Sequence, residues 1–142
     1  MSTVEQFLDL NSRKVWSLRP ENRVIDSLFL MAEKNIGCVL IMNEEHLAGI
    51  FSERDYARKV VIQGKNSNET LLKEVMTDKL ITISPKTELD ECMQLMTGHR
   101  IRHLPIVDNN KVIGLISIGD VVKEMIVQQK NQIEELQKYI SG

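Results

Sequence analysis

The chain has 142 residues, of which 42% are hydrophobic and 27% are charged, and its formal net charge is −2; this length suits one compact domain or two small fused halves. The small net charge and the 4% aromatic content argue against nucleic acid as the main partner. No apolar run approaches the roughly 18 residues of a membrane-spanning helix, and the N-terminal residues lack the features of a signal peptide, so we expect a cytoplasmic protein without a membrane partner.

The first half of the chain predicts a strand, a helix, two strands and a second helix. A short extended segment ends before Pro20, and Asn22 stands where the N-cap of a helix is expected. Strands are expected over residues 37–42 and 47–51, with a polar turn between them. A second helix is expected to begin near Ser52. The apolar residues that define the first helix by their spacing are Val24, Leu28, Met31 and Ala32.

A polar linker and a short lead-in helix follow. The linker covers residues 64–70, and residues 71–76 predict the lead-in helix, which residues 4–8 resemble. The second half then repeats the order of the first, with a helix N-cap expected at Thr87, strands over residues 103–107 and 112–116, and a further helix near Ser117.

The two halves are copies of one pattern. Shifting the chain so that residue 15 lies on residue 80 aligns them without a gap, and residues with backbone and polar roles coincide. The coinciding pairs include Pro20 with Pro85, Gly49 with Gly114, Ser52 with Ser117 and Asp55 with Asp120.

This repeat predicts an α+β fold with α/β-like character: tandem β-α-β-β-α repeats related by pseudo-twofold symmetry, whose sheets pack together and leave two related clefts. We expect a first repeat with its lead-in at residues 1–63, a linker at 64–70, a second repeat at 71–127 and a C-terminal helix extension at 128–142.

The doubled Ser-x-x-Asp motif has two interpretations. Ser52 with Asp55, and Ser117 with Asp120, each follow a strand and open a helix, which is the arrangement of a capping box. The same groups suit a ribose phosphate, because helix N-terminal amides and a hydroxyl bind anions and an ionised carboxylate accepts hydrogen bonds from ribose hydroxyls.

Basic residues near these motifs also have two interpretations. They are solvated charges of a helix or a strand edge, or they bind phosphate, which guanidinium groups hold through two hydrogen bonds. The residues concerned are Arg54, Arg58 and Lys59 at the first motif, and Arg102 and His103 at the second.

Motifs of catalysis and metal binding are missing from the sequence, so we expect a protein that is not an enzyme and holds no metal. The segment 114–119 has the glycine spacing of a phosphate-binding loop, but Asp120 and Val121 replace the required Lys and Ser or Thr. The three histidines lack the spacing of metal ligands. Cys38 and Cys92 form no C-x-x-C motif and are expected to be reduced core thiols.

Together these segments resemble a pair of cystathionine-β-synthase (CBS) domains, over roughly residues 4–127. The segments that carry the resemblance are 49–55, 74–77, 81–85, 101–108 and 114–120. The resemblance implies a regulatory module that binds AMP, ADP, ATP or another adenosyl ligand, that in some relatives accepts NAD(H), and that often forms a homodimer. No output domain is evident, so a signal would pass to an effector protein that the sequence does not identify.

The resemblance also implies roles for single residues of the second repeat. Asp120 would hold the ribose hydroxyls and Ser117 would face phosphate, as would Arg102 and His103. The adenine would be lined by backbone groups of Thr82, His103, Leu104 and Pro105.

The first repeat departs from this pattern. Asp55 and Ser52 match their counterparts and Ser17 stands at the position of Thr82, but Gly37, Cys38 and Val39 replace Arg102, His103 and Leu104. The first site therefore borrows Arg54 or Arg58 for phosphate, takes a different ligand, or stays empty.

The C-terminal helix carries apolar residues at intervals of seven. One row consists of Ile126, Ile133 and Ile140, and the other of Val122, Gln129 and Leu136. This spacing is typical of a helix that packs on its own domain, of a dimer seam or of a docking helix. It leaves open the alternative that the protein is an interaction module whose clefts bind nothing.

Overall fold

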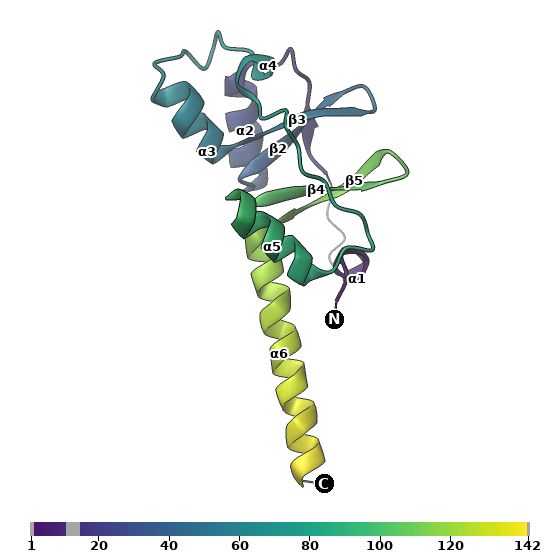
Figure 1. Ribbon diagram of the computed structural model, residues 1–142. Helices are drawn as coiled ribbons and strands as arrows, with labels where there is room; N and C mark the ends of the chain where they lie inside the picture. Colours follow the sequence, from purple (N-terminus) through teal and green to yellow (C-terminus); the bar gives the residue numbers. More distant parts are fainter. Residues whose placement is uncertain (1, 11–14, 142) are drawn as a thin grey trace. The chain divides into compact units, whose positions relative to one another are not determined.

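The computed structural model describes residues 2–10 and 15–141. These residues form two compact units, one made of residues 15–81 and the other of residues 2–10 and 82–141. Both units mix helices and strands, as predicted (Figure 1). The unit of residues 15–81 contains the body of the first repeat together with the lead-in helix of the second repeat, at residues 72–75. The other unit contains the body of the second repeat together with the lead-in helix of the first, at residues 4–10. The two repeats therefore exchange their lead-in helices.

The unit of residues 15–81 is built on a three-stranded sheet in the order β1-β2-β3. Strand β1 (Ser17–Leu18) runs parallel to β2 (Cys38–Asn43), and β2 pairs antiparallel with β3 (His46–Ser52). Helix α2 (Val24–Lys34) and the lead-in helix α4 (Leu72–Val75) contribute to its core. The buried side chains of this core are Val24, Met31, Val39, Ile41, Phe51, Val60, Leu72 and Val75.

The helix after β3 is divided into two parts. Helix α3 (Glu53–Asp55) forms one turn and continues as a π-helix, η1 (Tyr56–Val61). In η1 the Ile62 amide donates to the Ala57 carbonyl at 3.0 Å, a hydrogen bond that spans five residues. The sequence pattern predicted the start of this helix at Ser52 but not the wider turn.

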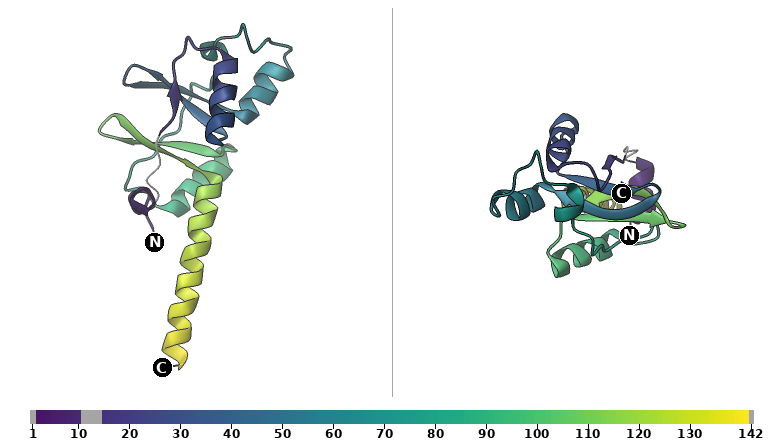
Figure 2. Two further views of the ribbon diagram at one scale, coloured as in Figure 1. Left: turned by 180° about the vertical axis from the view of Figure 1, so that it is seen from behind. Right: turned by 90° about the horizontal axis from the view of Figure 1, so that it is seen from above.

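The other unit contains the hairpin of β4 (His103–Asp108) and β5 (Lys111–Ser117). Its helices are the lead-in helix α1 (Val4–Leu10), α5 (Leu89–His99) and the long α6 (Ile118–Ser141). The extended segment predicted before Pro85 reduces to one parallel bridge between Ile83 and Ile106. Helix α6 continues past the strands and the other helices of its own unit (Figures 1 and 2); Gly142, the last residue of the predicted extension, lies outside the described residues.

Both predicted N-caps were placed one residue too early. Arg23 and Glu88 occupy the N-cap positions of α2 and α5. The Asn22 side chain instead accepts a hydrogen bond from the Arg19 amide at 2.7 Å, and Thr87 Oγ1 accepts one from the Ser84 amide at 3.1 Å. These oxygens close the turn before each helix, a use that Asn and Thr side chains share with capping.

Each lead-in segment is fixed by backbone hydrogen bonds. In the unit of residues 15–81, the Leu72 amide donates to the Asn22 carbonyl at 2.8 Å, and Thr77 forms a bridge with Ile50 of β3. In the other unit, the Val4 amide donates to the Thr87 carbonyl at 2.8 Å. Among the described residues, no helix is both long and apolar enough to cross a bilayer.

Candidate functional site

The two Ser-x-x-Asp motifs adopt the same hydrogen-bonded geometry. Oδ2 of Asp55 accepts from the Ser52 amide and hydroxyl, both at 3.0 Å, and Ser52 Oγ accepts from the Asp55 amide at 3.1 Å. Oδ2 of Asp120 accepts from the Ser117 amide and hydroxyl, both at 2.9 Å, and the Asp120 amide donates to Ser117 Oγ at 3.1 Å. The motifs are therefore capping boxes, which hold each hydroxyl and carboxylate at the start of a helix.

Strand register brings further predicted residues to these boxes. Cys38 pairs with Ser52 between β2 and β3, and His103 pairs with Ser117 between β4 and β5. The residue before each of these strands also contacts the helix that follows the box. The Gly37 carbonyl accepts from the Glu53 amide at 3.0 Å, and the Arg102 carbonyl accepts from the Ile118 amide at 2.8 Å.

The residues predicted to line an adenine differ in burial, since Thr82 is exposed and His103 is half-buried. Leu104 and Pro105 are buried, as are Cys38 and Val39 in the other unit. The Pro105 carbonyl accepts from the Ile83 amide at 3.0 Å, which places the neighbouring Thr82 beside β4.

Ser17 lies on the corresponding side of β2 in the unit of residues 15–81. Ser17 of β1 pairs with Leu40 of β2, which pairs on its other side with Ile50 of β3, two residues before Ser52. Each unit thus has a central strand with an extended segment on one side and the strand that ends in a capping box on the other.

A lysine and a threonine engage the carboxylate of the first repeat. Lys59 Nζ lies 3.4 Å from Asp55 Oδ1 and donates to Thr77 Oγ1 at 3.0 Å. The Thr77 hydroxyl in turn donates to Asp55 Oδ1 at 3.3 Å. Sequence reasoning missed the role of Thr77, because it is 22 residues from Asp55 and only the fold brings the two together.

The two repeats differ in charge around their boxes. Glu124 of the second repeat aligns with Lys59 of the first. Arg54 on α3 and Arg58 on η1 are exposed residues that follow the first box, whereas Arg102 is an exposed residue that precedes β4 in the second. The second repeat also has a basic residue on its helix, because Lys123 of α6 aligns with Arg58, so the repeats differ in Arg102 before β4 and in the exchange of Lys59 for Glu124.

Cys38 occupies the strand position that His103 has in the second repeat, and its chemistry is different. Burial, with the nearby charge of Asp55 as a smaller cause, raises the pKa of the Cys38 thiol from 9.0 to about 12. The thiol is therefore protonated and weakly nucleophilic at neutral pH. Among residues 2–10 and 15–141, no group of three or more His, Cys, Asp or Glu residues is placed to hold a metal ion.

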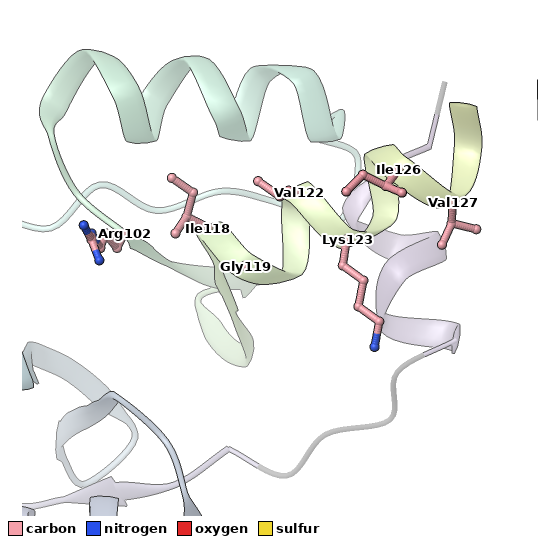
Figure 3. Close-up of a pocket in the computed structure, with 7 residues that line it drawn as sticks. All are labelled: Arg102, Ile118, Gly119, Val122, Lys123, Ile126 and Val127. Carbon is pink, nitrogen blue, oxygen red and sulfur yellow. The ribbon is translucent and has the colours of Figure 1, made fainter. Parts of the chain in front are cut away.

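A largely apolar pocket, here called the α6 groove, lies beside the second box. Its volume is about 600 Å³. Arg102 lies at one end and Val127 at the other, along the exposed face of the first turns of α6 (Figure 3). The residues that line it are Arg102, Ile118, Gly119, Val122, Lys123, Ile126 and Val127. Its apolar lining differs from the polar groups that the second box presents.

Comparison with known proteins supplies a family and relatives of known structure. The CBS domain family matches the chain twice, over residues 7–62 and 72–127. The mitochondrial CBS domain-containing protein CBSX3 of Arabidopsis thaliana is 39% identical over 127 residues, which cover 86% of this chain and 62% of that protein. This chain thus spans less than two thirds of that relative.

Solved structures share the fold. A CBS-domain protein of Burkholderia ambifaria is 47% identical, with a TM-score of 0.87 over 90% of this chain and 96% of that chain. The CBS domain pair of protein MJ0100, solved in complex with 5′-methylthioadenosine and S-adenosyl-L-methionine, is 22% identical, with a TM-score of 0.78 over 90% of this chain and 98% of that chain.

Proposed function

Because the chain belongs to the CBS domain family, we propose that it is a regulatory module, and not an enzyme, that binds an adenine nucleotide of the AMP, ADP or ATP class. The observation that carries the proposal is the doubled capping box, in which a hydroxyl, a carboxylate and helix N-terminal amides are held together at a strand end. The adenosine ligands of the MJ0100 pair support the choice of ligand class.

The second repeat is the main site in this proposal. The Asp120 carboxylate accepts hydrogen bonds from the ribose hydroxyls in this proposal, because an ionised carboxylate is an acceptor only and the capping box holds it at the start of α6. Ser117 and Arg102 face the phosphates, and Arg102 is exposed and suited to hold them through two hydrogen bonds. Backbone groups of Thr82, His103 and Leu104 line the adenine.

The first repeat is the second candidate site in this proposal. Lys59 and Thr77 contact Oδ1 of Asp55, so a ribose bound there must share this carboxylate with them. Arg54 and Arg58 are exposed and supply positive charge for a phosphate.

The proposed signal is a change in the populations of different arrangements of the two repeats. A ligand that binds one arrangement more tightly shifts the equilibrium toward it by its difference in affinity. A separate effector protein then reads that arrangement.

Thermal unfolding with AMP, ADP, ATP, NAD⁺, NADH and S-adenosylmethionine tests this function. At a hundredfold excess over Kd, a ligand stabilises the folded state by about 2.7 kcal/mol, which raises Tm by on the order of 10 °C in a chain of this size. We expect this increase with an adenine nucleotide, its loss in Asp120→Asn and its retention in the matched Asp55→Asn.

Two results would contradict the proposal. If no ligand raises Tm of the folded protein, the boxes serve only to cap helices. If NADH or S-adenosylmethionine alone raises Tm, the ligand class is wrong although the site is present. Circular dichroism of both variants verifies that the helices remain formed.

A further inference from the structure

The two capping boxes share one backbone arrangement at the strand end, but the side chains there differ in charge. In the first repeat the Glu53 amide donates to the Gly37 carbonyl at 3.0 Å, and in the second the Ile118 amide donates to the Arg102 carbonyl at 2.8 Å. Glu53 and Ile118 therefore occupy equivalent positions, and so do Gly37 and Arg102.

The Glu53 carboxylate lies over the residue that precedes β2. A Cβ added at Gly37 would be 3.0 Å from Glu53 Oε1, so the absence of a side chain at Gly37 leaves the room that this carboxylate takes. In the second repeat, Arg102 and Ile118 lie at the same end of the α6 groove, and Ile118 contributes an aliphatic side chain (Figure 3). The strand end thus carries a negative charge in the first repeat and a positive charge in the second.

Neighbouring residues of its own helix do not neutralise Glu53. The residues three and four positions later, which are neighbours on a helix surface, are Tyr56 and Ala57. Lys59 is engaged elsewhere, at 3.4 Å from Asp55 Oδ1. Within the part of the chain that the structure describes, Glu53 forms no ion pair. A group bound at this strand end therefore meets the charge of Glu53.

We propose that Glu53 determines the ligand specificity of the first repeat, so that this repeat takes an adenosine whose 5′ substituent is uncharged or positively charged. The inference rests on the proposed function, because it assumes that the Asp residues of both boxes hold the ribose in the same way. The 5′ substituent then extends to Ser52 and Gly37, as the phosphates extend to Ser117 and Arg102 in the second repeat.

Electrostatic repulsion gives the expected size of the effect. A phosphate monoester carries a charge of about −1.5 to −2 at pH 7. Its repulsion by one carboxylate at a separation of a few ångströms in water lowers affinity by about tenfold. A neutral 5′ group is not repelled by Glu53, and an ammonium group is attracted to it.

Arg54 and Arg58 favour the opposite preference, since both are exposed and guanidinium groups bind phosphate. Arg54 is the next residue after Glu53, and successive residues do not face each other on a helix. Arg58 aligns with Lys123, so a cation at this helix position is common to both repeats. The charge that distinguishes the first strand end from the second is that of Glu53.

Titration calorimetry with adenosines that differ only at the 5′ position tests the proposal. The probes are AMP, adenosine and 5′-amino-5′-deoxyadenosine, whose 5′ groups are negative, neutral and positive at neutral pH. Asp120→Asn reports on the first repeat, and Asp55→Asn reports on the second. We expect the first repeat to bind adenosine and the amine at least about tenfold more tightly than AMP, and the second repeat to prefer AMP.

Removal of the charge of Glu53 should change this preference. In the Asp120→Asn protein, Glu53→Gln is expected to raise the affinity for AMP about tenfold and to leave the affinity for adenosine unchanged. The matched control is Glu45→Gln, which removes the same charge from an exposed residue in the turn between β2 and β3 and should have no effect on either affinity. Circular dichroism verifies that each variant is folded.

Two results would overturn the proposal. If AMP binds the first repeat more tightly than adenosine, the cations of Arg54 and Arg58 outweigh Glu53. If Glu53→Gln leaves the affinity for AMP unchanged, Glu53 does not determine the preference.

The same titrations separate this inference from the proposed function. If Asp120→Asn binds none of the probes while Asp55→Asn binds AMP, the inference is wrong and the proposed function is supported. If Asp120→Asn binds the amine selectively while Asp55→Asn does not bind AMP, the inference is supported and the proposed function is contradicted.

Discussion

At the scale of the residue, the two repeats use one capping box with different neighbours. The Asp55 carboxylate contacts Lys59 and Thr77, and Cys38 lies across the strand pair from Ser52. In the second repeat, His103 takes the place of Cys38 and Glu124 that of Lys59. Cys38 gives the first box an apolar neighbour where the second has His103, whereas Lys59 in place of Glu124 gives it a positive charge, so the two boxes differ in chemistry although their hydrogen-bonded geometry is the same.

The buried thiols make stability depend on pH in the alkaline range. The folded state holds the Cys38 proton up to a pKa of about 12, whereas an unfolded thiol loses it near 9.0. Between these values the folded state binds more protons, so the free energy of unfolding falls as pH rises, by at most about 1.4 kcal/mol per pH unit for one thiol. Below pH 9 this group has no such effect.

Urea unfolding of wild type and Cys38→Ala, in steps from below pH 9 to near pH 12, measures this contribution. The variant is expected to lose stability less steeply over that window. Cys92→Ala is the matched control, because burial, with a smaller effect of Glu91, raises the pKa of Cys92 only to about 11, and its change in slope should end earlier. Equal slopes for wild type and Cys38→Ala would contradict the assignment.

At the scale of the element, the aligned glycines are sites of close approach. A Cβ at Gly49 would lie 2.8 Å from the Thr77 carbonyl oxygen, because Thr77 forms a bridge with Ile50 of β3. A Cβ at Gly114 would lie 2.9 Å from Cδ2 of Leu8 on α1. In each unit the glycine lets a lead-in segment cross a strand.

Alanine at these two positions should have unequal effects. Gly49→Ala pushes against a backbone carbonyl that is held by the Ile50 amide at 3.0 Å, so we expect a loss of about 1–3 kcal/mol in the free energy of unfolding. Gly114→Ala meets the end of a flexible side chain, so the loss should be smaller. Urea unfolding of both variants measures the two losses in the free energy of unfolding. Equal losses, or a larger loss for Gly114→Ala, would show that the contacts with Thr77 and Leu8 do not determine the cost of the added methyl group.

At the scale of the whole molecule, the lead-in helices couple segments that are distant in the chain. Phe7 of α1 is buried in the unit that contains residues 82–141, and Leu72 of α4 is buried in the unit of residues 15–81. The second repeat therefore depends on α1 of the first repeat for its core, and the first repeat depends on α4 of the second.

Hydrogen exchange in the full chain can locate this dependence. Truncation of a large buried side chain costs about 2–5 kcal/mol, and the nearby amides should lose protection first. We expect Phe7→Ala to increase exchange mainly in residues 82–117 and Leu72→Ala mainly in residues 15–61. If Phe7→Ala instead increased hydrogen exchange in residues 15–61, and Leu72→Ala in residues 82–117, the assignment of α1 and α4 to these units would be wrong.

Much of the fold could be predicted from the sequence, because the alignment of Pro20, Gly49 and Ser52 with their counterparts fixed the order of the elements and the start of each second helix. The box geometry followed from the spacing of Ser and Asp. The helix caps were misplaced by one residue, because Asn22 and Thr87 can serve a turn or a helix equally well.

Long-range contacts could not be predicted. Thr77 reaches Asp55 only after α4 has packed on residues 15–61, and apolar periodicity does not reveal on which body a helix packs. The π-helix η1 depends on hydrogen bonds that leave no clear pattern in the sequence.

The exchange of lead-in helices bears on how such a chain originates. Duplication copies a lead-in helix together with the body that follows it, yet in this chain α1 completes the body formed by residues 82–117 and α4 completes the body that precedes it. The boundaries of the duplicated sequence and the boundaries of the compact unit therefore differ by one helix. A fusion protein that is to contain one complete unit must include residues from both repeats.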